Sequence, residues 1–187
     1  MKKEPKEIIA FQKHMFAHLL KTMRDYGLTT YDDIVDFKAK GMLDEPLWKI
    51  VEANGKYKGQ YISSGIKEIA DKLNMSPNAI KVSEIVTYLK DNIDFQLNSG
   101  IVTSDEKDCK VQLEHVTPRK KIIEEILKLS SEEDINKYLD EKCIGCLVLK
   151  AEHKTLNDSI YNNEEVWQRY KDAGIKVFDS KNNDWVW

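Results

Sequence analysis

Two pairs of polar residues, far apart in the chain, have the side chains needed for hydrolysis. Glu114 and His115 close an apolar segment that begins at Lys110, whereas His153 and Asn157 lie four residues apart just after the segment CIGCLVL. On a helix, a spacing of four residues places both side chains on one face. A carboxylate, an imidazole and an amide oxygen can hold a divalent cation, and a second imidazole can take a proton from water. These residue types indicate metal-assisted hydrolysis.

The segments around these residues predict two strands and a helix that position them. The first strand is expected to end at Glu114 and His115, and the second lies within CIGCLVL. A helix beginning at Ala151 or Glu152 would then carry His153. Between the strands, residues 119–143 show helical periodicity, which predicts two short helices, the second capped by Ser130 or Ser131.

The pieces LEHVTP and CLVLKAEHKTLN resemble the two halves of the HNH, or His-Me finger, nuclease motif. The resemblance covers residues 110–157, and it implies two antiparallel strands and a helix around one metal ion. The sequence departs from the family in two ways. A long helical insert replaces the short glycine-containing loop, and Cys146 stands where the family's middle asparagine is expected.

Carried over by position, the resemblance implies a role for each polar residue. His115 would be the general base, Glu114 and His153 would be metal ligands, and Asn157 would be a third ligand or would orient the base. An imidazole with an ordinary pKa near 6.5 suits proton transfer at neutral pH. The implied cofactor is one divalent cation, with Mg2+ preferred and Mn2+ or Zn2+ also suited to these ligands.

The resemblance also implies the substrate, which is double-stranded DNA cut at its phosphodiester bonds. Basic residues gather in sequence about both halves of the motif and are expected to contact phosphates. They are Arg119, Lys120, Lys150 and Lys154. A restriction-type endonuclease is the preferred setting, with homing and host-defence nucleases as alternatives, because the N-terminal part is large enough to read a short site.

Composition limits the classes of protein that fit. The chain has 187 residues, 41% of them hydrophobic, which is enough for a real core. A net charge of -3 argues against a protein that coats nucleic acid by bulk charge, although it allows a local basic cleft. The sequence shows neither a signal peptide nor an apolar run long enough to span a membrane, so we expect a cytoplasmic protein without a membrane partner.

The three cysteines leave two interpretations open. Cys109, Cys143 and Cys146 are too few for a disulfide framework, which fits a reducing compartment. With a histidine they could close a zinc site and make the protein a zinc-stabilised interaction module. Alternatively, the cysteines of CIGCLVL pack as small hydrophobic residues in a buried strand.

Residues 1–100 predict a mostly helical part that would recognise DNA, and residues 101–187 would form the ββα-metal core of an α+β protein. A first helix from residue 7 to about residue 26 is expected, ending at Gly27. Its expected apolar face consists of Ile8, Phe11, Met15, Leu19 and Met23. A second helix would cover residues 31–41, and a short third element would follow Pro46. The segment 54–65 is expected to be a loop or irregular hairpin, either a nucleic-acid contact or an ordinary surface loop.

Residues 66–90 predict two helices separated at Asn74, the second capped by Ser76. This segment resembles the helix-turn-helix of bacterial DNA-binding domains. A helical hairpin that merely packs in the core has the same pattern. The competing function is therefore a non-catalytic DNA-binding regulator that uses residues 66–90 as its reader.

The C-terminal segment predicts a helix ending near Gly174 and then a strand. Trp167 and Tyr170 are expected in the core rather than stacked on bases. For Arg169 we favour a solvated charge over a contact to the DNA backbone. The tail ends in Trp185 and Trp187, which would allow a homodimer contact if they do not pack back.

Overall fold

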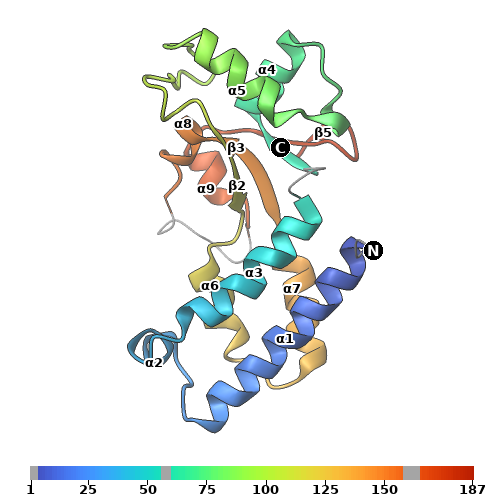
Figure 1. Ribbon diagram of the computed structural model, residues 1–187, viewed down its shortest axis with the longest axis vertical. Helices are drawn as coiled ribbons and strands as arrows, with labels where there is room; N and C mark the ends of the chain where they lie inside the picture. Colours follow the sequence, from blue (N-terminus) through green and yellow to red (C-terminus); the bar gives the residue numbers. More distant parts are fainter. Residues whose placement is uncertain (1–3, 56–59, 158–164) are drawn as a thin grey trace. The chain divides into compact units, whose positions relative to one another are not determined.

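The structure is a computed structural model that describes residues 4–55, 60–157 and 165–187. Its elements belong to two compact units (Figure 1). The first unit comprises Met1–Asn54 and His115–Ile144, and the second comprises Gly55–Glu114 and Gly145–Trp187. Among the described helices, none combines the length and apolar character that a membrane span requires.

The first unit is built from helices. They are α1 (Pro5–Asp25), α2 (Tyr31–Asp36), α3 (Lys40–Gly55), α6 (Arg119–Ile126) and α7 (Glu132–Lys142). Helices α6 and α7 are the two predicted helices of the insert, and the side chain of Ser131 accepts a hydrogen bond from Asp134 N at the start of α7, as predicted. Helix α1 packs on α7 and helix α2 on α6, so the insert forms one core with the N-terminal helices.

Helix α1 has the predicted extent but turns a different face to the core. Phe16, Leu20 and Met23 are buried, whereas Phe11 and Met15, which belong to the expected apolar face, are exposed. The predicted helical spacing of apolar residues is correct, but apolar residues with this spacing lie on two adjacent faces of α1. The helix that packs against α1 decides which of the two faces is buried.

The second and third helices divide differently from the prediction. Helix α2 ends at Asp36, and Lys38 adopts a left-handed backbone with φ of 59°. Gly41, the expected end of α2, and Pro46, the expected start of a third element, both lie inside α3. The early stop follows from Lys38, because a left-handed residue cannot continue a right-handed helix.

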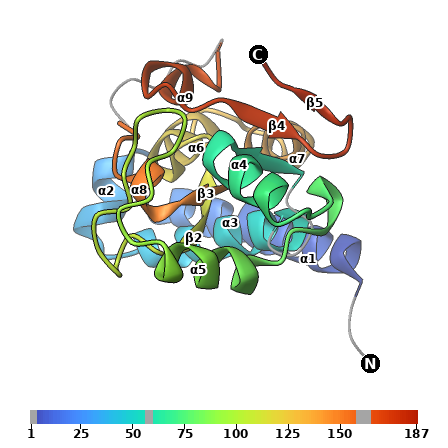
Figure 2. The same ribbon diagram turned by 90° about the horizontal axis from the view of Figure 1, so that it is seen from above.

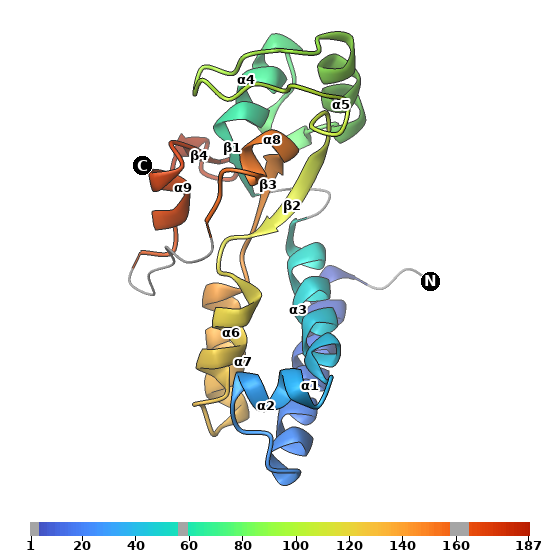
Figure 3. The same cartoon turned by 90° about the vertical axis from the view of Figure 1, so that its left-hand side faces the viewer.

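The second unit contains one mixed sheet, in the order β2-β3-β1-β4-β5. The strands are β1 (Tyr61–Ser63), β2 (Val111–His115), β3 (Gly145–Leu149), β4 (Val177–Asp179) and β5 (Asp184–Trp185). Strand β1 pairs parallel with β3 and antiparallel with β4, and β4 pairs antiparallel with β5. Lys150 N, just after β3, donates to Lys110 O, just before β2, at 2.7 Å. Strands β2 and β3 are therefore antiparallel neighbours (Figure 3).

Helices complete the second unit. They are α4 (Ser64–Lys72), α5 (Val82–Asp91), α8 (Lys150–His153) and α9 (Gln168–Asp172). Helices α4 and α5 lie side by side (Figures 2 and 3). They pack with β1 and β3 around a core that includes Ile62, Ile66, Ile85 and Leu149. Together with the helical unit, this sheet confirms the predicted α+β class.

The predicted helix-turn-helix segment has a different connection. Helix α4 ends at Lys72 and Asn74 is left-handed with φ of 52°, as the predicted break requires. However, Ser76 precedes a short 3-10 helix, η1 (Pro77–Ala79), and α5 begins only at Val82. The predicted start of the second helix is wrong. The connection is also longer than the three- or four-residue turn that defines a helix-turn-helix.

The two units do not coincide with the boundary predicted at residue 100. Residues 55–114 pack with 145–187, and the insert 119–143 lies with the N-terminal helices. The chain therefore crosses from one unit to the other at Asn54 to Gly55, Glu114 to His115 and Ile144 to Gly145.

Candidate functional site

Within the second unit, the predicted ligands Glu114 and His153 lie together. Glu114 is near the end of β2, and His153 is the last residue of α8, which follows β3 without a loop. The two side chains meet, and Glu114 Oε2 lies 3.0 Å from His153 Nε2.

Arg169 holds the other oxygen of the same carboxylate. A terminal guanidinium nitrogen of Arg169 lies 3.0 Å from Glu114 Oε1. The Arg169 side chain is 2% exposed and that of Glu114 17%, whereas His153 is 36% exposed. The cluster thus has a buried cationic end and an imidazole end that reaches solvent. The guanidinium fixes the carboxylate by a charge-assisted hydrogen bond, which is stronger than a neutral one.

The expectation that Arg169 is a solvated charge is wrong. Arg169 lies on α9 between Trp167 and Tyr170, which are in the core as predicted, with exposed fractions of 8% and 0%. An arginine within one turn of two core aromatics has to pass through the core unless its side chain bends away. A buried arginine needs an anionic partner, so this apolar context was a usable sequence signal.

Glu152 positions α8 and was missed by the sequence analysis. Its side chain is fully buried and accepts hydrogen bonds from Leu149 N at 3.0 Å, Gly65 N at 2.9 Å and the hydroxyl of Ser63. These donors belong to the start of α8 and to the start of α4. Burial raises the pKa of the Glu152 carboxyl above its ordinary value. Glu152 therefore joins α8 to α4 and fixes the position of His153 one residue further on.

His115, the predicted general base, ends β2 and belongs to the first unit. Its side chain is 5% exposed, and its ring centroid lies 5.3 Å from that of Trp48 on α3. The next residue, Val116, donates its N–H to Ile144 O at 3.0 Å. The packing against Trp48 fixes the imidazole, and the predicted strand end at this residue is confirmed.

Asn157 does not share a helical face with His153, so that prediction is wrong. Helix α8 ends at His153, and Leu156 N bonds to His153 O in a turn. The hydroxyl of Thr155 donates to Glu152 O at 2.8 Å. Such a side-chain bond competes with the helical pattern. Asn157 lies beyond this turn and is exposed.

The Glu114 and His153 donors fit a divalent cation as a pair. Two adjacent ligands at about 2.1 Å from an octahedral Mg2+ lie about 3.0 Å from each other, because their bonds meet near a right angle. The observed separation is 3.0 Å. A cation bound by both would take the place of the proton that joins them. Among the described residues, no group of three or more His, Cys, Asp or Glu side chains is arranged to hold a metal ion, so water, substrate or an amide would have to complete the coordination.

The predicted phosphate-contacting residues fall on both units and are largely paired. In the first unit, Arg119 lies 3.6 Å from Asp44, and Lys120 lies 3.7 Å from Glu124 and 5.0 Å from the Tyr31 ring centroid. The other two, Lys150 and Lys154, belong to the second unit.

In the second unit, Lys154 pairs with Asp108. The hydrogen bond between them lowers the pKa of the Asp108 carboxyl and raises that of Lys154. Lys150 is half-buried, and within the part of the chain that the structure describes its ammonium has no ion-pair partner. A phosphate would have to compete with the carboxylates at three of the four predicted positions.

The cysteines are buried thiols. Cys143 lies in the first unit, with Sγ 3.5 Å from Leu47 O, whereas Cys109 and Cys146 lie in the second. Burial raises the pKa of Cys143 to about 12 and raises the pKa values of Cys109 and Cys146 as well. Zinc binds the thiolate, so this environment supports the interpretation of the cysteines as small core residues.

Comparisons with protein-family models, curated proteins and solved structures found nothing that matches this chain.

Proposed function

We propose that the protein is a metal-dependent endonuclease of the His-Me finger type that hydrolyses DNA. The observation that carries the proposal is the 3.0 Å approach of Glu114 Oε2 to His153 Nε2. The motif resemblance named these two residues as ligands of one ion, although they are far apart in the sequence. A separation of 3.0 Å is also that of an ordinary hydrogen bond between an imidazole and a carboxylate, so the support comes from the fact that the two residues named by the motif are the ones that meet.

The order of elements supports the same proposal. Strand β2 ends at the proposed base, an antiparallel neighbour follows as β3, and a helix carrying the second ligand begins directly after it. This is the strand, strand and helix order that a ββα-metal core requires. The insert of α6 and α7 enlarges the connection between the strands without interrupting either one.

In the proposed reaction, His115 takes the proton of the attacking water, Glu114 and His153 would hold the ion, and Arg169 keeps the Glu114 carboxylate in place. Asn157 and the four basic residues keep the roles that the resemblance implies for them. When bound, the divalent ion would supply positive charge for the phosphate and the departing oxygen. Mg2+ is the preferred ion, with Mn2+ and Zn2+ as alternatives, and a restriction-type nuclease is the preferred setting.

The test combines plasmid cleavage with an independent measurement of metal binding. Wild-type protein should cut plasmid DNA in the presence of Mg2+ or Mn2+, and EDTA should abolish this cleavage. The ion should also raise the melting temperature, because a ligand that binds only the folded state stabilises it. Glu114→Gln and His153→Gln should lose both effects. His115→Asn should lose cleavage and keep the shift in melting temperature.

His18→Gln is the matched control, since His18 is an exposed histidine of the first unit, and it should retain both. Cleavage that survives EDTA would exclude the metal mechanism. Cleavage that survives His115→Asn would exclude the assigned base. Tight duplex binding without cleavage under every ion would instead favour the non-catalytic regulator.

A further inference from the structure

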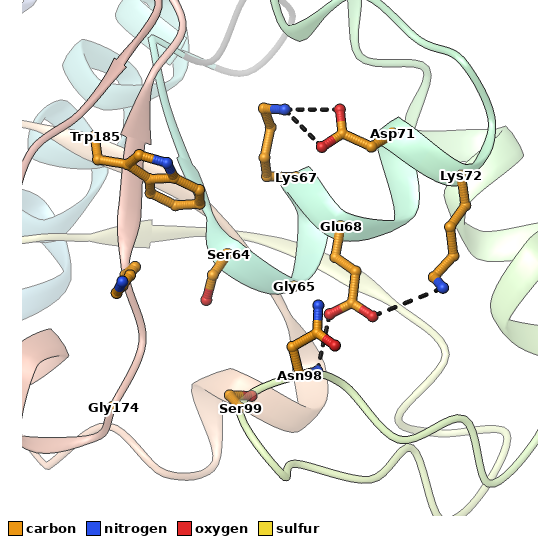
Figure 4. A pocket seen from close by; sticks show the side chains of 11 residues that line it. Ser64, Gly65, Lys67, Glu68, Asp71, Lys72, Asn98, Ser99, Gly174 and Trp185 are labelled. Carbon is orange, nitrogen blue, oxygen red and sulfur yellow. Dashed lines mark hydrogen bonds and ion pairs between the residues drawn. The ribbon is translucent and has the colours of Figure 1, made fainter.

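A cavity of about 610 Å³ opens beside the first turn of α4 in the second unit (Figure 4). Its volume is within the range of roughly 300–1,000 Å³ that is typical of small-ligand sites. The walls come from α4, from the segment at Asn98 and Ser99, from Lys176 before β4, and from Trp185 on β5. None of the proposed catalytic residues lines it.

An aromatic ring with a fixed position forms one wall of the cavity. Trp185 is 41% exposed. Its ring packs nearly perpendicular to that of Phe178, with centroids 5.3 Å apart and an interplanar angle of 81°. Lys67 Nζ lies 5.0 Å from the centroid of the Phe178 ring. The indole is therefore braced from one side and keeps a large exposed surface, which is the arrangement that binds a flat apolar ligand such as a nucleobase.

One lysine of the cavity is available for an anion. Lys67 is held at 2.7 Å by both oxygens of Asp71, and Lys72 lies 4.0 Å from Glu68. Lys176 is exposed, and among the described residues no carboxylate pairs with its ammonium. The ammonium of Lys176 can therefore bind a phosphate without first breaking an ion pair.

The start of α4 does not provide a second anion site. Ser64 N donates to Lys176 O at 2.8 Å, Gly65 N to Glu152 Oε1 at 2.9 Å, and Ile66 N to the hydroxyl oxygen of Ser63 at 3.3 Å. These N–H groups would otherwise be the donors that bind phosphate at a helix start. Any phosphate in this cavity must consequently be held by side chains.

We propose that this cavity binds an unpaired nucleotide of a nucleic acid, with the base stacked on Trp185 and a phosphate on Lys176. The side-chain amide of Asn98 and the hydroxyl of Ser99, which form another wall (Figure 4), supply donors and acceptors for the edge of the base. The proposal rests on the proposed nuclease function, and it adds that the substrate has an unpaired or extruded base at this position.

Binding of a fluorescein-labelled oligothymidylate in EDTA tests the proposal. Trp185→Ala should bind roughly 5- to 150-fold more weakly, which is the usual loss for one base-stacking aromatic. Trp185→Phe should restore most of the affinity. Tyr26→Ala removes another exposed aromatic, 76% exposed and in the first unit, and should bind as wild type does.

Two further measurements separate stacking from charge. An abasic oligomer of the same length should bind wild type more weakly than the oligothymidylate does. Trp185→Ala should bind the two oligomers with equal affinity. Lys176→Gln should reduce the slope of log affinity against log salt by about 0.7, the value for one phosphate on a single strand. Lys181→Gln, an exposed lysine outside the cavity, should not change that slope. An oligouridylate arm distinguishes RNA from DNA.

The outcomes distinguish this proposal from the nuclease proposal. Equal binding of abasic and normal oligomers, or unchanged binding by folded Trp185→Ala, overturns the nucleotide site even if plasmid cleavage is observed. Trp185-dependent binding in EDTA with no cleavage under any divalent ion leaves the nucleotide site standing and overturns the nuclease.

Discussion

Replacing Arg169 by methionine should destabilise the protein by about 2–3 kcal/mol. Breaking a buried ion pair by removing one partner costs about 3–5 kcal/mol. In this variant the cost comes from the Glu114 carboxylate that loses its partner, and this carboxylate is 17% exposed and keeps its contact with His153. Partial hydration and the remaining hydrogen bond lower the expected loss. Methionine fills much of the space of the arginine stem, so cavity formation adds little.

Urea unfolding followed by circular dichroism measures this loss, provided that the slope with denaturant is unchanged. The double variant Arg169→Met/Glu114→Gln completes a thermodynamic cycle, and we expect a coupling of about 1–3 kcal/mol between the two residues. Arg119→Met is the matched control. Its arginine is 43% exposed and 3.6 Å from Asp44, so the loss should stay within about 0.5 kcal/mol. A coupling indistinguishable from zero would refute the assignment of Arg169 as the residue that holds Glu114.

Three other predictions follow from single contacts. Gly65→Ala places a Cβ 2.7 Å from Glu152 Oε1 and should lower the free energy of unfolding in urea by about 1–3 kcal/mol. The control Gly41→Ala lies inside α3 with no atom within 4 Å of its Cβ and should instead stabilise the protein by up to about 1 kcal/mol. Equal effects of the two substitutions would contradict the close approach at Gly65. Burial raises the pKa of Glu152 above its ordinary 4.5, so the contribution of this carboxyl to stability is complete at lower pH and falls as the pH rises through the raised pKa. The stability lost in Glu152→Gln should therefore shrink as the pH rises above 4.5. A loss that grows with pH would contradict the direction of the pKa shift. The thiol of Cys143, with a pKa of about 12, should react with a thiol reagent at pH 8 only after unfolding, and fast labelling of the folded protein would show that it is accessible.

Local sequence patterns determined the elements that carry the proposed chemistry. The strand ending at His115, the two helices of the insert and the helix that carries His153 were predicted because apolar periodicity, strand length and capping residues are properties of neighbouring residues. The break at Asn74 also needed only one residue able to adopt a left-handed backbone. Each of these features was read within a window of a few residues, and each is present in the structure.

Tertiary structure alone decided which of these elements pack together. The three residues of β1 are too few to show an alternating pattern, and they were expected in a loop or an irregular hairpin. In the structure β1 lies between β3 and β4, with Ile62 fully buried. The insert packs with the N-terminal helices, although its sequence position predicted a place in the C-terminal core. A short strand is stabilised by its neighbours rather than by its own residues, so only the completed sheet reveals it.

The same distinction holds for the site. The motif resemblance named Glu114 and His153 as a pair, but no local pattern specifies that Arg169 binds the same carboxylate or that Glu152 ties α8 to α4. Buried charges take partners wherever the fold brings an opposite charge or a donor within reach. The distance between a buried charge and its partner is set by the packing of whole strands and helices. For this reason the sequence alone indicated which residue types form the candidate site, and the tertiary structure determined their geometry.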